Sequence, residues 1–370
     1  MELNYLLITV TGLALGALSV VLVHYGNPGN MGYCIACFLR DIAGALGFHR
    51  AAAVQYLRPE IMGLSLGAFA SSVVTREFRP RGGSSPIIRF LLGMNFMIGA
   101  LIFLGCPVRL FLRLAGGDWN AIAGLVGLVA GVAGGFALIR RGFTLGRASE
   151  TGAAAGLVMP ALMVGLLVLL FTAPKFIFRS TSGPGAMAAP VLLSLGVGLL
   201  IGVLAQRSRF CTIGGIRDLL FIRDTYLIRG ALGLVIGAFV ANLAFGTFKP
   251  GFVGQPIAHT NGLWNFIGMF IAGMAATLLG GCPLRQLVMS GEGNTDAAIT
   301  ILGMIFGAAI SHNFGLASSA QGVTVNGMWA GAIALVITML IGWFGAAPFG
   351  ERAARGDAVA SGNSVMAGGD

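Results

Sequence analysis

Residues 105–110 read Gly-Cys-Pro-Val-Arg-Leu, and residues 281–286 read Gly-Cys-Pro-Leu-Arg-Gln. Earlier in each half, residues 34–41 read Cys-Ile-Ala-Cys-Phe-Leu-Arg-Asp and residues 211–218 read Cys-Thr-Ile-Gly-Gly-Ile-Arg-Asp. After the second motif, glycines recur at matching spacing: Gly117, Gly127 and Gly131 correspond to Gly293, Gly303 and Gly307. Chance can supply one such match but hardly three in order, so the sequence predicts one structural unit present twice.

The composition indicates that this unit lies in a membrane. Of the 370 residues, 56% are hydrophobic and 10% are charged, and the mean hydropathy is +0.88, whereas soluble domains carry about a quarter charged residues. The formal net charge of +10 does not indicate nucleic-acid binding, because basic residues collect in the cytoplasmic loops of membrane proteins. The sequence also lacks a Walker-type phosphate loop, and we expect no cofactor.

Ten apolar runs have about the length that a membrane-spanning helix needs. They cover residues 5–23, 60–75, 88–105, 120–139, 154–172, 188–205, 228–246, 263–280, 295–311 and 326–346. We therefore expect an all-α polytopic membrane protein in which each repeat has four crossings and two re-entrant half-helices. The expected divisions are a first repeat at 1–150, a linking helix and loop at 151–187, a second repeat at 188–312, an extra transmembrane helix at 313–346 and a disordered tail at 347–370.

Counting the crossings predicts how the two repeats are oriented. The run at 154–172 lies between two sets of four crossings, so the repeats are offset by five crossings. An odd offset turns the second repeat upside down relative to the first. Lys and Arg residues are in excess on one side of this arrangement, which predicts cytoplasmic N- and C-termini in a bacterial inner membrane. Inverted repeats are a recurring transporter architecture, with the substrate site at their interface.

The two Gly-Cys-Pro motifs predict helix N-termini that carry a thiol. Glycine ends one helix and proline is favoured as the first residue of the next, so Cys106 and Cys282 fall at N-cap positions beside free backbone amides. Arg109 and Arg285 follow about one turn later. A thiol, exposed amides and a guanidinium together predict an anion site with a polarisable contact atom. The alternative is a helix break used only for packing.

Cys34 and Cys211 each precede an apolar stretch too short to cross a bilayer, which predicts a re-entrant half-helix. Buried cysteine can also act simply as a small hydrophobe. The Arg-Asp dipeptides that follow, at Arg40 and Arg217, either form an ion pair that holds the half-helix or contact the anion. Cys37 has no counterpart in the second repeat, where glycine replaces it.

Metal and redox chemistry are the other uses that cysteines suggest. One Cys-x-x-Cys without a second pair is weak support for zinc, and the four histidines lack a mutual spacing, so we expect no metal. Cys34 and Cys37 could instead form a redox pair on the outer side, which would make the protein a transmembrane thiol–disulfide electron carrier. The arginines beside the thiols favour anion transport over this alternative.

The doubled Gly-Cys-Pro-x-Arg motif, the run Gln-Arg-Ser-Arg-Phe-Cys at 206–211 and the two-copy organisation resemble the YeeE/YedE family of membrane proteins. The resemblance extends from about Leu13 to Trp343 and is strongest to the YedE branch, which is associated with selenium metabolism; the YeeE branch takes up thiosulfate. The resemblance implies an hourglass-shaped protein with a dent on each face. It also implies that cysteines along the path contact the sulfur anion in relay. These cysteines are Cys106, Cys282, Cys211 and either Cys34 or Cys37.

We therefore expect a permease, not an enzyme, that imports a small sulfur- or selenium-containing anion. The residues expected to bind the substrate are Cys34, Cys37, Cys106, Cys211, Cys282, Arg109, Arg285, Arg40 and Arg217. The lipid bilayer and a soluble sulfur-carrier or selenium-pathway protein are the expected partners. A relay of neutral thiols predicts that serine partly replaces cysteine, whereas a covalent persulfide-type relay predicts that it does not.

Overall fold

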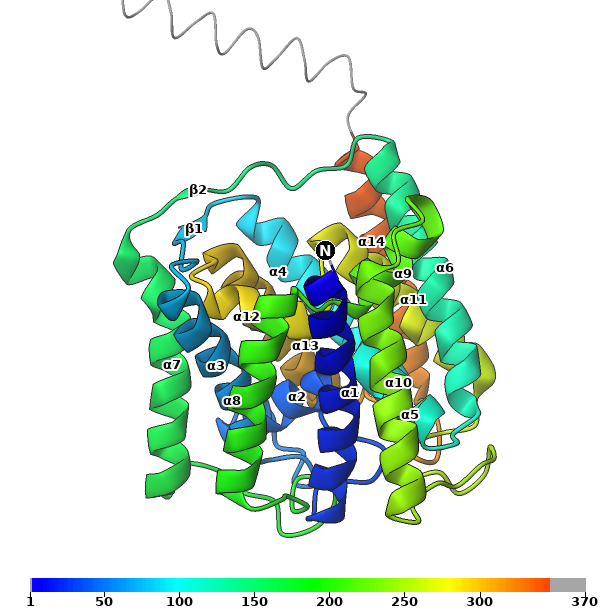
Figure 1. Ribbon diagram of the computed structural model, residues 1–370. Helices are drawn as coiled ribbons and strands as arrows, with labels where there is room; N and C mark the ends of the chain where they lie inside the picture. The colour runs from blue at the N-terminus through cyan, green and yellow to red at the C-terminus, as the bar shows by residue number, and fades with distance from the viewer. Residues whose placement is uncertain (1, 347–370) are drawn as a thin grey trace, which may run out of the picture.

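The computed structural model describes residues 2–346 and is a bundle of helices (Figure 1). The long helices are α1 (Glu2–His24), α3 (Pro59–Val74), α4 (Pro86–Phe103), α6 (Asn120–Arg140), α7 (Ala153–Thr172), α8 (Val191–Ser208), α10 (Tyr226–Ala244), α11 (Gly262–Leu279), α13 (Thr295–Asn313) and α14 (Val325–Phe344). The short helices are α2 (Ile35–Ala45), α5 (Pro107–Ala115), α9 (Thr212–Phe221) and α12 (Pro283–Gly291). Two two-residue strands, β1 (Arg81–Gly82) and β2 (Ser149–Glu150), pair antiparallel at one end.

The prediction of an all-α polytopic membrane protein is confirmed. Within residues 2–346, nine helical segments are long and apolar enough to cross a bilayer, and α3 is a shorter apolar helix of 16 residues. Each of the ten predicted runs coincides with one of the long helices. The tail predicted at 347–370 lies outside the described residues.

Helix α8 differs from its predicted bounds at both ends. The run predicted at 188–205 becomes α8, which begins after Pro190 and extends three residues further than expected. The extension is polar, but the amide of Gln206 accepts a hydrogen bond from Ser71 (2.7 Å) and donates one to Glu77 (2.6 Å). Polar residues can therefore continue a membrane helix where a neighbouring helix satisfies them.

The two halves of the chain have the same order of elements. Each half begins with a long helix and a short helix, continues with two long helices and ends with a short helix and a long helix. The contacts between halves are exchanged in matching pairs, because α1 packs on α10 as α8 packs on α3, and α6 packs on α11 as α13 packs on α4. In Figure 1 the chain enters α1 at the end where β1 and β2 lie and enters α8 at the opposite end. The division into repeats stays a prediction that this order supports.

The glycines that repeat in the sequence occupy matching close contacts. Gly127 of α6 lies against the carbonyl oxygen of Phe266 in α11, and Gly303 of α13 lies against that of Phe90 in α4. A Cβ atom at either glycine would come within 3.0 Å of these backbone atoms. Small residues thus let the long helices approach closely. The four short helices, α2, α5, α9 and α12, lie between the packed long helices. Every residue of α2 is buried.

Candidate functional site

The cysteines of the first half meet at the N-termini of two short helices. Cys34 is the N-cap of α2 and Cys106 is the N-cap of α5, as predicted, and their Sγ atoms lie 3.9 Å apart. The backbone amide of Cys37 donates a hydrogen bond to the Cys34 thiol over 3.4 Å. All three thiols are fully buried. Two half-helices therefore direct their amide ends at one cluster of sulfur atoms, where partial negative charge is favoured.

The Cys106 thiol joins the two short helices. It interacts with the backbone amide of Arg109 in its own helix and with that of Ala36 in the first turn of α2. Because one sulfur faces the amides of both helix N-termini, the position of each half-helix depends on the other. We call Cys34, Cys37, Cys106 and Arg109 the first thiol cluster.

Arg109 is a buried cation beside this cluster. Its Nη1 donates a hydrogen bond to the Cys37 Sγ over 3.3 Å, and its Nε and Nη2 donate to the carbonyl oxygens of Asn30 (2.9 Å) and Ile257 (2.8 Å). The side chain has no exposed surface, and no carboxylate is among its contacts in the described part of the chain. A buried guanidinium without a counter-charge favours an anion nearby.

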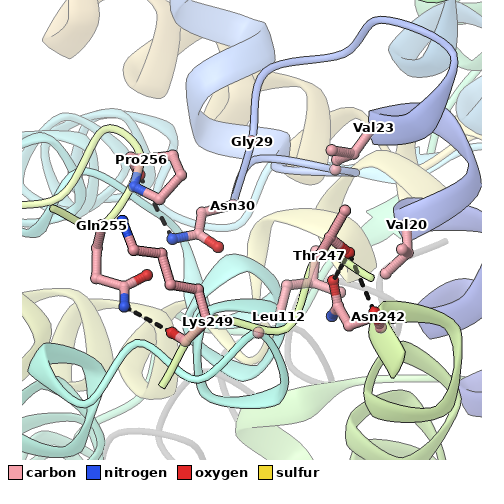
Figure 2. Close-up of a pocket in the computed structure, with 12 residues that line it drawn as sticks. Val20, Val23, Gly29, Asn30, Leu112, Asn242, Thr247, Lys249, Gln255 and Pro256 are labelled. Atoms are coloured by element: carbon pink, nitrogen blue, oxygen red, sulfur yellow. Dashed lines mark hydrogen bonds between the residues drawn. The ribbon is translucent and has the colours of Figure 1, made fainter. Parts of the chain in front are cut away.

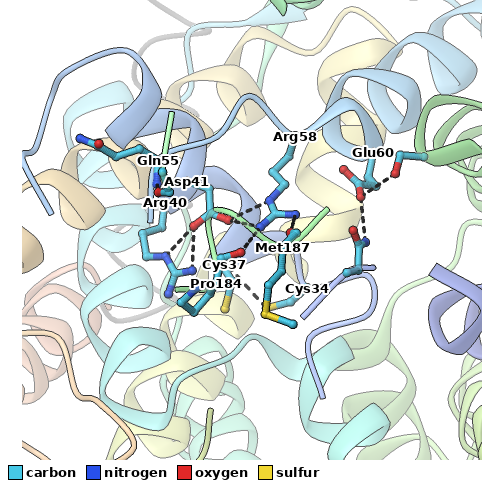
Figure 3. A network of polar contacts seen from close by, with 12 residues as sticks. Cys34, Cys37, Arg40, Asp41, Gln55, Arg58, Glu60, Pro184 and Met187 are labelled. Atoms are coloured by element: carbon cyan, nitrogen blue, oxygen red, sulfur yellow. Dashed lines mark hydrogen bonds and ion pairs between the residues drawn. The ribbon is translucent and has the colours of Figure 1, made fainter. Parts of the chain in front are cut away.

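Within residues 2–346, Arg40 donates no hydrogen bond to a thiol and instead takes part in an ion-pair network (Figure 3). Its Nε and Nη2 both donate to one oxygen of Asp41, and Arg58 donates to the other oxygen over 2.8 Å. Arg58 also donates to the carbonyl oxygens of Pro184 and Met187 in the linking loop. The structure thus favours the ion-pair interpretation of Arg40-Asp41. Sequence reasoning missed Arg58, whose only signal was its place directly before α3.

The second half repeats the thiol geometry with two cysteines. Cys211 caps α9 and accepts a hydrogen bond from the backbone amide of Gly214 over 3.3 Å, as Cys34 does from Cys37. Cys282 caps α12, and its own amide donates to the Cys211 thiol over 3.5 Å. The Cys282 thiol interacts with the amides of Thr212 and Arg285. We call Cys211 and Cys282 the second thiol pair.

The arginines of the second half are bound by carboxylates. Arg285 pairs with Glu292 over 3.2 Å, and Arg209 pairs with the same carboxylate over 3.1 Å. Arg217 pairs with Asp218 over 2.7 Å, and 35% of its side chain is exposed. The structure therefore brings the five predicted cysteines together as a cluster of three and a pair. Of the four predicted arginines, Arg109 alone donates a hydrogen bond to a thiol within residues 2–346.

A cavity of about 240 Å³ borders two loop segments that Arg109 contacts (Figure 2). Asn30 and Pro256 line it, and the Asn30 amide lies 3.5 Å from the Pro256 carbonyl oxygen. Arg109 binds the carbonyl of Asn30 and that of the residue after Pro256. Lys249 lines the same cavity. A cavity with Lys249 in its wall is thus lined by residues from the two loop segments that Arg109 contacts.

Two histidines that the sequence kept apart are neighbours in the structure. The rings of His49 and His312 lie 4.6 Å apart. His49 Nδ1 accepts from the amide of Ala51, so its Nε2 donates to the Arg40 carbonyl oxygen. Burial lowers the pKa of His49, which keeps the ring neutral. Within the described residues, no group of three His, Cys, Asp or Glu side chains is placed to hold a metal ion.

Parts of this chain are similar in sequence to proteins of sulfur transport. The family model described as sulphur transport matches residues 207–355, which include the second thiol pair. The thiosulfate transporter TsuA of Spirochaeta thermophila is 31% identical over 106 residues, which cover 27% of this chain and 30% of that protein. The thiosulfate transporter TsuA of Escherichia coli is 30% identical over 108 residues, covering 29% of this chain and 30% of that protein. The matched part thus spans less than a third of the length of each relative.

Proposed function

We propose that this chain, whose residues 207–355 match the sulphur-transport family model and which resembles the YeeE/YedE family, is a permease that imports a small thiosulfate-like anion along a path lined by its cysteines. The observation that carries this proposal is Arg109, a fully buried guanidinium that contacts a thiol and no carboxylate within residues 2–346. Such a residue is costly inside a membrane unless it serves a ligand or a pathway. A sulfur anion would supply the missing negative charge.

The thiols are suited to contact the terminal sulfur or selenium atom of such an anion. A protonated thiol is a weak donor and a soft contact for a terminal sulfur or selenium atom. The half-helix N-termini beside Cys34 and Cys106 add backbone amides that favour the anion's charge. A thiolate would repel the anion, so we propose that the thiols remain mostly protonated during passage. The Cys37 thiol, which contacts Arg109, belongs to this path together with Cys34.

The pairing of thiols in both halves supports a relay. The proposed inversion of the second half brings the first thiol cluster in from the outside and the second thiol pair in from the cytoplasm. This arrangement draws support from the shared order of elements and from the exchanged helix contacts. We propose, from the distribution of Lys and Arg in the sequence, that the N-terminus lies in the cytoplasm of a bacterial inner membrane. We extend the proposal to selenium-containing anions, and to a soluble sulfur-carrier or selenium-pathway protein that accepts the product.

The test is uptake of labelled thiosulfate, and separately of selenium-containing anions, into cells that lack their own importers. The wild type is compared with Cys106→Ala and Cys282→Ala variants whose amounts in the membrane are matched, and with Ser182→Ala, a change in an exposed loop. We expect uptake in the wild type and in Ser182→Ala and its loss in both cysteine variants. Absence of uptake of every sulfur and selenium anion would refute the proposal. Cys106→Ser and Cys282→Ser then separate a neutral relay, which keeps part of the uptake, from a covalent one.

A thiol–disulfide electron carrier is the second candidate, because the structure pairs thiols in each half. The Cys34 thiol interacts with the thiols of both Cys106 and Cys37, and Cys211 interacts with Cys282. The Cys34–Cys106 and Cys211–Cys282 pairs join different motifs, and they add to the Cys34–Cys37 pair that the sequence suggested. The carrier predicts a fraction of disulfide-bonded Cys34–Cys106 in protein alkylated directly in cells and analysed by mass spectrometry. Anion transport predicts that all five thiols are recovered reduced.

A further inference from the structure

A second cavity, of about 450 Å³, lies at the last turn of α13. It is lined by Arg40 from α2, by Ser311 and His312 from α13 and by Ser318 from the loop that follows, and we call it the α13 cavity. Helix α13 begins beside β1, where Arg81 pairs with Asn294, so its last turn lies at the opposite end of the bundle. In the proposed topology this is the outer end.

Three polar atoms in the lining residues have no hydrogen-bond partner within residues 2–346. They are the hydroxyl oxygens of Ser311 and Ser318 and the Nε2 atom of His312. Ser311 is 1% exposed and Ser318 is 8% exposed, so bulk solvent does not satisfy them. Buried polar groups are nearly always paired, and leaving one unpaired destabilises the fold. Three such atoms in residues that line one cavity indicate a ligand that accepts or donates hydrogen bonds there.

The charge of the cavity wall favours an anion. Arg40 and Arg58 share the single carboxylate of Asp41, so two guanidinium groups and one carboxylate leave this network with one positive charge. Arg40 belongs to both the network and the cavity wall. The carbonyl of Ser311, at the negative end of α13, accepts the amides of Leu316 and Ala317 and is therefore occupied. The hydroxyl groups of Ser311 and Ser318 and the positive charge of Arg40 are thus available to bind a ligand.

The cavity also borders the first thiol cluster. Ile257 lines the cavity, and Arg109 donates a hydrogen bond to its carbonyl oxygen over 2.8 Å. Ile257 has a φ of 50°, a backbone conformation that a β-branched residue rarely adopts. Residues held in such conformations cluster at ligand sites and switch regions. Arg40, in the cavity wall, is one helical turn from Cys37 on α2. Arg109 contacts both Ile257 of the cavity wall and the Cys37 thiol.

We infer that the α13 cavity binds the oxygen atoms of a sulfur oxyanion before the anion reaches Cys37. Ser311 and Ser318 donate hydrogen bonds to the oxygens, and Arg40 supplies the charge. The volume leaves room for waters beside the anion. The place of the cavity on a path rests on the proposed function, whereas the binding itself does not.

The test is titration of the full-length protein in nanodiscs with thiosulfate and with inorganic sulfate by calorimetry. The double variant Ser311→Ala/Ser318→Ala removes the two unpaired hydroxyls, and Ser182→Ala, in an exposed loop, is the control. We expect the double variant to bind both anions about 10-fold or more weakly, because each lost hydrogen bond contributes roughly fivefold. Ser182→Ala should bind as the wild type does. Sulfate is informative because it offers oxygens without a terminal sulfur.

The thermal stability of the variants separates a ligand role from a structural one. Removing unpaired hydroxyls should leave the ligand-free melting temperature unchanged or raise it, while the increase caused by thiosulfate becomes smaller. A lower melting temperature without ligand would assign the serines to the fold and overturn the inference. Unchanged affinity for both anions in the double variant would overturn it as well.

Uptake distinguishes this inference from the proposed function. Cys106→Ala should bind sulfate normally in the α13 cavity and lose uptake. If the wild type binds sulfate through Ser311 and Ser318 but imports no sulfur anion, the inference holds and the proposed function fails. If uptake is normal and the double variant binds as the wild type does, the proposed function holds and the inference fails.

Discussion

The same motif, Gly-Cys-Pro-x-Arg, opens α5 in the first half and α12 in the second, yet its arginine has different surroundings in each. Arg109 donates to a thiol and to two carbonyl oxygens and has no carboxylate partner in the described part of the chain. Arg285 is paired with Glu292, which also binds Arg209. The thiols occupy matching helix caps in both halves, so the geometry repeats while the charge does not.

A single position explains much of this difference. The two motifs are offset by 176 residues, from Cys106 to Cys282, and the same offset relates Gly116 to Glu292. The first half therefore has no side chain where the second half has a carboxylate. The pattern suggests that the first thiol cluster holds the anion more tightly and that the second thiol pair releases it. In the proposed topology, an anion arriving from the outside meets the tighter cluster first.

The Arg-Asp pairs should show the largest difference between the halves. Asp41 is fully buried between Arg40 and Arg58, so Asp41→Asn leaves two uncompensated buried guanidinium groups. We expect a loss of about 3–5 kcal/mol in the free energy of unfolding. In the second half, Arg217 is partly exposed, and Asp218→Asn should cost at most about 1 kcal/mol. Unfolding in mixed detergent micelles measures both. Equal losses would show that the two networks are equally sealed.

The next-largest difference should be in thiosulfate uptake, between variants of the two motif arginines, Arg109 and Arg285. Arg109→Gln removes a charge-assisted contact of roughly 1.5–3 kcal/mol, so the thiosulfate concentration for half-maximal uptake should rise about 10- to 100-fold. Arg285→Gln should change it by less than about threefold, because Arg285 is already neutralised and Arg209 still pairs with Glu292. Arg109→Lys, which keeps the charge, should recover part of the affinity. A larger effect at Arg285 would reverse the proposed order of affinities.

Glu292→Gln should make the second half resemble the first. Without its carboxylate partner, Arg285 is available to an anion at the second thiol pair. We expect binding from the cytoplasmic side to strengthen by about two- to fivefold, the range of a partly exposed ion pair. Thiosulfate uptake into inside-out vesicles measures it, with Glu77→Gln, which also removes a partner of Arg209, as the control. Unchanged uptake would mean that Arg285 does not reach the path.

The sequence predicted the parts of this comparison that are local. Apolar runs, the Gly-Cys-Pro breaks and the cysteine caps depend on neighbouring residues, and the structure confirms them. The ion pairs depend on segments distant in the chain. Arg58 reaches Asp41 because the loop at Pro184 and Met187 folds across it, and no local pattern encodes that contact.

Other long-range features were hidden from the sequence in the same way. The rings of His49 and His312 lie together although 263 positions separate them. Arg217 and Arg285 carry the predicted motif, but the motif does not say whether a carboxylate neutralises them. The chemical groups of each motif could therefore be predicted from the sequence, whereas the net charge around each motif could not.

The smallest expected difference concerns the accessibility of the thiols. Cys211 is 6% exposed, whereas Cys34, Cys37 and Cys106 are fully buried. Alkylation rates follow exposure and thiolate character, so a membrane-permeant maleimide should modify Cys211 somewhat faster than the first thiol cluster. Mass spectrometry of protein labelled for increasing times measures the order. Thiosulfate should slow the modification of Cys211 if the anion occupies the second thiol pair, whereas sulfate should not, since it lacks the terminal sulfur that the thiols contact. Faster labelling of Cys34 or Cys106 would mean that the first half opens more readily than the second, and would contradict the view that the first half is the sealed one.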